Sequence, residues 1–196
     1  MLRRTVAFTP ARRELYQAKL GMYLFLAGVV FVFFSGLLVY AVVRTAAVGP
    51  AGVPLSIPTE FLLSTFALVG VSLFLHLAVH YVHVERINAF HNSLLIGLIC
   101  GVIFFVCQVT GMLFLLQQHF SATDGSTRVF GIAFVLATLH AIHVIAGFVI
   151  LGWIVWRALR GAYDHERHWP VDICATYWHF LDAVWIVMLV TFLIVR

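Results

Sequence analysis

Five apolar segments, each long enough to cross a membrane, constrain this chain more than any other feature of its sequence. They lie at residues 19–43, 58–82, 93–117, 129–156 and 174–195. A helix needs about 20 mainly apolar residues to cross a hydrocarbon layer about 30 Å thick. Only 10% of the residues are charged, whereas a water-soluble domain carries about 25%. We therefore expect an all-α, polytopic membrane protein built as a bundle of five transmembrane helices, and a soluble globular protein is excluded.

The segments between the apolar stretches are short, and this limits the domain organisation. We expect residues 1–18 to form a basic tail and residues 19–196 to form a single transmembrane domain. No connection is long enough for a separate catalytic domain. Whatever the protein does therefore happens in or beside the membrane, and we expect no catalysis from this chain alone.

The distribution of basic residues predicts the orientation in the membrane. With five spans, the N-terminal tail and the second-to-third and fourth-to-fifth connections share one side. That side holds nine basic residues and the other side holds three, Arg44, Arg128 and Arg196. Cytoplasmic loops carry an excess of lysine and arginine, so we expect a cytoplasmic N-terminus and an external C-terminus. Because the basic residues are divided among helix ends, nucleic-acid binding has no support.

Polar residues inside the fourth and fifth segments are the first candidates for a functional site. His140 and His143 lie three residues apart on the fourth segment, and Gly147 shares their helix face. His179 and Asp182 have the same spacing on the fifth segment, at a similar depth. An ionisable group near the membrane centre costs at least about 2.5–3.5 kcal/mol, so each needs a partner or a function.

Three interpretations of these four residues stay open. The first is a buried polar network, in which Asp182 accepts a hydrogen bond from a histidine and docks the fifth helix onto the fourth. The second is a direct role in proton or ligand chemistry. The third is ligation of haem or metal, since a membrane cytochrome b also needs histidines on facing helices at matching depth.

A second group of titratable residues lies at the end of the second segment. It comprises His80, His83, Glu85 and His91, on the side where we expect the cytoplasm. Histidines titrate near neutral pH and could collect protons at the membrane surface. The alternative is that these residues are simply solvated at the level of the lipid headgroups.

Two segments resemble signatures of a known family. Residues 130–147 carry Thr138-x-His140-x-x-His143-Val144-x-x-Gly147, which resembles the fourth-helix signature of subunit III of the haem-copper terminal oxidases. Residues 177–185, with the sequence YWHFLDAVW, are similar to the C-terminal signature of that family. Residues 20–26 and 101–108 resemble its first and third shared helices more weakly. Five spans match the short bacterial form of the subunit.

The resemblance implies a non-catalytic subunit III of an oxidase of the cytochrome c oxidase type, in a bacterial inner (plasma) membrane. It implies packing on subunit I, partnership with subunit II, a bound phospholipid, and support for proton uptake and for stability during oxygen reduction. Haem and copper are then expected in the partner subunits, with no metal or cofactor in this chain.

The resemblance also assigns residue roles. By position, His140, His143, His179 and Asp182 form the internal network, and Trp178, Trp185 and Gly147 serve packing or lipid contact. Two alternatives for the whole chain remain. One is a membrane haem b electron-transfer protein, and the other is an accessory subunit of a quinol oxidase or a nitric oxide reductase.

Overall fold

The computed structural model describes residues 10–47, 59–121, 126–163 and 168–194. This part of the chain is all-helical, as the sequence predicts. Its five helices are α1 (Pro10–Ala47), α2 (Thr59–His83), α3 (Ile87–Ser121), α4 (Ser126–Leu159) and α5 (Trp169–Ile194). Each contains a stretch long and apolar enough to cross a membrane. The chain is therefore a multi-pass membrane protein built as a helical bundle.

Most of the helices run beyond the apolar segments from which they were expected. Helix α1 begins at Pro10, inside the segment expected as a tail, and α3 begins at Ile87, before its apolar segment. Proline is well tolerated in the first turn of a helix, because its missing N–H would have no partner there. Hydropathy marks only the part of a helix that suits hydrocarbon, so it does not locate helix ends in more polar surroundings.

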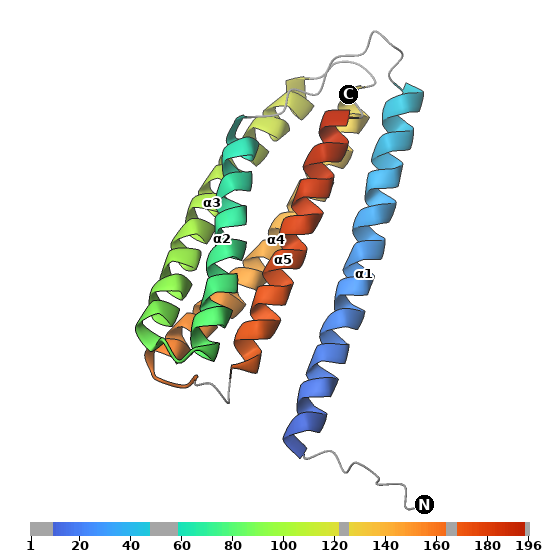
Figure 1. Cartoon of the computed structure of the whole chain (residues 1–196). Helices are drawn as coiled ribbons and strands as arrows, with labels where there is room; N and C mark the ends of the chain where they lie inside the picture. The colour runs from blue at the N-terminus through green and yellow to red at the C-terminus, as the bar shows by residue number, and fades with distance from the viewer. Residues whose placement is uncertain (1–9, 48–58, 122–125, 164–167, 195–196) are drawn as a thin grey trace, which may run out of the picture.

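Helix α5 holds the bundle together. It packs against α1, α2 and α4, while α2 packs most extensively against α3. Within the described residues, α1 contacts only α4 and α5. Figure 1 shows this arrangement, with α5 between α1 and the α2–α3 hairpin. Helices α4 and α5 each pack against three other helices.

Two helix endings fix one end of the bundle. Helix α2 turns into α3 through Glu85, which adopts a left-handed conformation with φ of 57°, and the Arg86 N–H donates to the Tyr81 carbonyl at 3.0 Å. The turn that follows α4 contains Gly161, with φ of 71°, where glycine carries no steric cost. We call this the tight-turn end of the bundle, comprising the described residues 80–91 and 157–172.

Glycines allow the helices to approach closely where larger residues would collide. A side chain at Gly97 would meet α2, and one at Gly101 would meet the Phe148 ring of α4. At Gly147 on α4, an added Cβ would lie 3.2 Å from the Tyr177 ring and 3.3 Å from Trp178, both on α5. Small residues therefore set the spacing between helices, as is common where lipid surrounds a bundle.

We predict that Gly147→Leu destabilises the protein, because the added side chain would push into Tyr177 and Trp178. Overpacking of this kind costs about 1–3 kcal/mol. Gly152→Leu on the same helix is the matched control, since nothing lies within 4 Å of a Cβ at that position. Thermal unfolding in one detergent should show a lower midpoint for Gly147→Leu alone. Equal midpoints for the two variants would contradict the packing.

Candidate functional site

The centre of the bundle is an aromatic cluster built around Trp185 of α5. The Trp185 ring meets Phe61 of α2, Phe104 of α3 and His140 of α4, with ring centroids 5.2, 6.3 and 5.3 Å away. Its Nε1–H donates to Thr65 Oγ1 on α2 at 3.0 Å. One side chain thus joins α5 to three other helices.

The sequence-predicted residue His140 lies inside this cluster. Its imidazole has no exposed surface and stacks on Trp185 at an interplanar angle of 27°. Phe33 and Phe104 meet it edge-on. Neither ring nitrogen has a hydrogen-bond partner within the described residues. In this conformation no group from outside the bundle can reach the imidazole, which acts as a flat packing element.

His143 and Tyr177 form the direct polar link between α4 and α5. The Tyr177 hydroxyl donates to the His143 backbone carbonyl at 2.9 Å. The His143 ring itself is bonded within α4, through Nδ1 to the Leu139 carbonyl at 2.8 Å. A carbonyl inside a helix has a second lone pair, so it can accept from tyrosine without losing its helical bond.

His179 and Asp182 face α2, not the histidines of α4. The ring of His179 lies 6.3 Å from that of His76 on α2, and the Asp182 carboxyl lies beside the Ser72 hydroxyl of α2. Neither Ser72 Oγ nor Asp182 Oδ1 has a partner that meets hydrogen-bond geometry in the described residues. The four residues expected as one network thus lie in two places, and within the described part of the chain no hydrogen bond joins them to one another.

The remaining sequence-predicted residues on α4 and α5 pack inside the bundle. Trp178 and Trp185 are buried, and the Phe148 ring meets Trp178 edge-on at 5.5 Å. Gly147 of α4 packs against the Trp178 ring of α5. These three positions contribute packing between α4 and α5 within this chain.

The four residues of the expected surface group lie at the tight-turn end. His80, His83 and Glu85 are exposed. His91 is partly buried, and its Nε2 lies 2.9 Å from the Ala158 carbonyl. That carbonyl belongs to the last turn of α4 and also accepts the Gly161 N–H at 2.9 Å. His91 therefore ties the start of α3 to the end of α4, whereas the ring of His83 lies beside that of His168.

Several polar contacts between the helices were not predicted from the sequence. Ser64 Oγ lies 3.5 Å from Gln108 Oε1 in the buried contact between α2 and α3. Ser72 and Thr65 supply polar groups to α5 from α2. Single serines and threonines in apolar helices commonly bond their own backbone, so their types alone do not indicate a partner helix. His76 was recognisable, because a histidine inside an apolar segment calls for a partner.

Comparison with known proteins gives a consistent result. The sequence profile described as "Cytochrome c oxidase subunit III" matches residues 16–195. The mouse protein "Cytochrome c oxidase subunit 3" is 30% identical over 139 residues, which cover 70% of this chain and 50% of the mouse protein. The protein of the same name from Synechocystis is 32% identical over 93 residues, covering 44% of this chain and 40% of its own length. The chain spans about half the length of the mammalian relatives it matches.

We predict that Tyr177→Phe lowers the stability of the protein, because it removes the hydrogen bond that ties α5 to α4. Such bonds contribute about 1 kcal/mol. Tyr163→Phe is the control, since the Tyr163 hydroxyl is buried without a partner in the described residues. Chemical unfolding in detergent should separate the two variants. A loss for Tyr163→Phe equal to that for Tyr177→Phe would argue against the bond.

Proposed function

The chain belongs to the cytochrome c oxidase subunit III family, and on that premise we propose that it serves as the non-catalytic subunit III of a haem-copper oxidase. The profile match carries this proposal, because residues 16–195 include nearly all of the five described helices. Oxygen reduction and electron transfer then belong to haem and copper in partner subunits I and II. The relatives are named as cytochrome c oxidase subunits, so a quinol oxidase, a nitric oxide reductase and a haem b carrier are not favoured.

The face shared by α2 and α5 is the surface proposed to pack on subunit I. His76 and His179 are exposed on it, about 10–15 Å inside the ends of their helices at a rise of about 1.5 Å per residue. Polar groups at that depth rarely face lipid, because the hydrocarbon offers them no hydrogen bonds. A protein partner that covers this face removes the cost. We call it the α2–α5 face.

A groove between α1 and α4 is the proposed phospholipid site. Its volume is about 710 Å³, and its walls are mostly aliphatic, with Val32, Val39 and Leu136 among the lining residues. Arg128 lies at one end of α4 and also lines the groove. An acyl chain suits the aliphatic walls, and a guanidinium suits a phosphate headgroup. Lipid bound here fills the gap beside α1.

The proposed setting is a bacterial inner membrane, with the N-terminus in the cytoplasm and the C-terminus outside. The excess of basic residues on the N-terminal side supports this orientation. It places the tight-turn end, with His80, His83, Glu85 and His91, at the cytoplasmic surface. There these residues support proton uptake into subunit I and help to keep the complex stable during turnover.

If the chain belongs to an oxidase complex, it should purify together with haem- and copper-containing subunits. We expect the full chain, affinity-purified from its native membranes in a mild detergent, to retain subunits with the visible absorption of haem and with bound copper. A further purification in a harsh detergent should leave this chain colourless. A haem spectrum retained by the isolated chain, and lost in His143→Ala, would instead support the electron-carrier alternative. Recovery without any haem or copper protein would contradict the oxidase assignment.

The proton-uptake role predicts a change in the pH profile of the complex. His80→Gln should lower turnover most at high pH, where protons are scarce and a surface donor matters more. Asn88→Ala is the matched control, because Asn88 is exposed at the same end of the bundle and does not titrate. Oxygen consumption measured between about pH 6 and 9 checks the expectation. Superimposable profiles for both variants and the parent would show that His80 is only a surface residue.

A further inference from the structure

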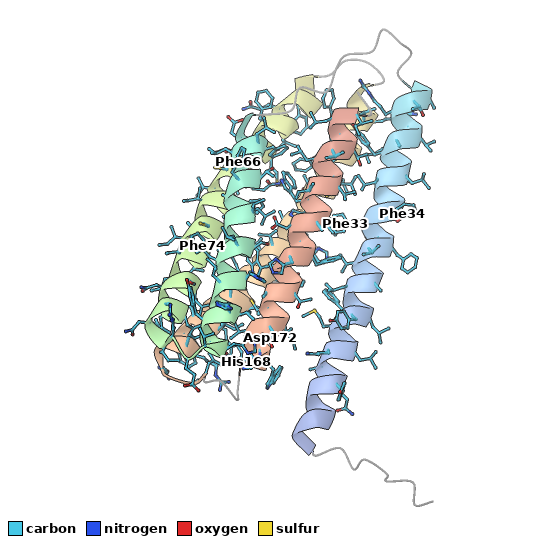
Figure 2. All side chains as sticks on the ribbon, in the orientation of Figure 1. Phe33, Phe34, Phe66, Phe74, His168 and Asp172 are labelled. Atoms are coloured by element: carbon cyan, nitrogen blue, oxygen red, sulfur yellow. The ribbon has the colours of Figure 1, made fainter. Side chains whose placement is uncertain are left out.

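Three side chains with metal-binding atoms converge at the tight-turn end from two separate parts of the chain. His83 is the last residue of α2, His168 directly precedes α5, and Asp172 lies in the first turn of α5. One ligand atom of each lies within 4.8 Å of the other two. Figure 2 labels His168 and Asp172 at this end of the bundle. We propose that His83, His168 and Asp172 bind one divalent transition-metal ion of the zinc class.

The distances suit a tetrahedral ion. Zinc lies about 2.0–2.1 Å from histidine nitrogens and about 2.0–2.2 Å from carboxylate oxygens, so neighbouring ligand atoms around a tetrahedral ion are about 3.4 Å apart. His168 Nε2 and Asp172 Oδ2 already lie 3.5 Å apart. The ring centroids of His83 and His168 are 4.1 Å apart, so a small side-chain rotation brings the third ligand into range. Water completes the fourth position.

The donor set selects the class of metal. Two imidazole nitrogens and one carboxylate oxygen suit zinc and its neighbours in the transition series, whereas magnesium and calcium prefer oxygen ligands alone. Zinc has no redox chemistry. An ion bound here would therefore take no part in the electron transfer proposed for the partner subunits.

The backbone holds these ligands in place without a metal. The His168 carbonyl accepts the N–H groups of Val171 at 2.8 Å and of Asp172 at 3.3 Å, which fixes His168 at the start of α5. His83 is fixed on the other side by the turn at Glu85 that ends α2. A site that is formed before binding loses less conformational entropy when the ion arrives.

The carboxylate of Asp172 has bonding capacity to spare. Its Oδ1 atom is buried and has no hydrogen-bond partner within the described residues, although the Asp172 side chain as a whole is 29% exposed and that of His168 is 17% exposed. Lys19 of α1 lines a small cavity with Asp172, so a cation already faces this carboxylate from another helix. A metal ion would satisfy the carboxylate and tie the end of α2 to the start of α5.

A zinc ion at this site would differ from the expectation that this chain holds no metal, and its binding does not depend on the oxidase assignment. A bound ion would remove His83 from the proton-collecting group, while His80 and His91 would be unaffected.

Titration calorimetry with Zn²⁺ on the full chain in detergent tests the site. We expect one ion to bind per chain. The affinity for Zn²⁺ should fall by about tenfold or more in His83→Gln and in His168→Gln, because even residues that only support metal ligands commonly change affinity by 10–100-fold. His80→Gln is the control and should bind like the parent, because it lies one turn away and outside the cluster. Equal weakening in all three variants, or no binding by the parent, would overturn the proposal.

A second measurement guards against variants that fail to fold. Without metal, the parent and His83→Gln should have the same midpoint of thermal unfolding. Zn²⁺ should raise this midpoint for the parent alone, because a ligand that binds only the folded state stabilises it. Co²⁺ in place of Zn²⁺ should give the visible absorption of a four-coordinate site in the parent. An equal rise with Zn²⁺ in both proteins would count against His83 as a ligand.

Discussion

The contact of Trp185 with three neighbouring helices is the interaction on which the rest of the bundle depends. Trp185 stacks on His140 of α4, meets Phe61 and Phe104 edge-on, and donates to Thr65 of α2. In lipid, apolar side chains gain little from leaving hydrocarbon, so close packing and interhelical hydrogen bonds must hold helices together. An indole supplies both, because its broad ring packs and its N–H finds an acceptor.

The same constraint explains how the polar residues are distributed. Those that face the interior, such as His140, are enclosed by rings, and Tyr177 bonds directly to the backbone of the neighbouring helix. His76 and His179 lie on the outside of the bundle at membrane depth. Such residues fit a chain that works inside a larger assembly, because a partner can supply the surroundings that lipid cannot. The proposed role as a non-catalytic oxidase subunit provides that partner.

The sequence predicted the fold class, because five long apolar stretches allow little else. It also singled out the residues of α4 and α5 that carry the family resemblance. It could not predict which helix each polar group would meet. His140 and Asp182 lie at similar depths, but depth does not determine the direction in which a side chain points around the bundle. That direction depends on which helices are neighbours, and α5 turned out to present Asp182 to α2.

Convergence at helix ends was equally hard to foresee. His83 and His168 are separated by 85 positions in the numbering, and the packing of α2 against α5 brings their rings to 4.1 Å. The left-handed position of the turn between α2 and α3 is occupied by Glu85 and not by the usual glycine. The sequence therefore contains no clear turn signal there. The sequence predicted His83 as a surface residue but did not predict that its ring would meet His168 and Asp172.

A structure of the chain in its native complex, determined by electron cryomicroscopy, tests the central claim most directly. The proposed function predicts that a catalytic haem-copper subunit covers the α2–α5 face, with His76 and His179 inside the interface and lipid in the groove between α1 and α4. An α2–α5 face exposed to lipid, or a complex without a haem-copper subunit, would contradict it.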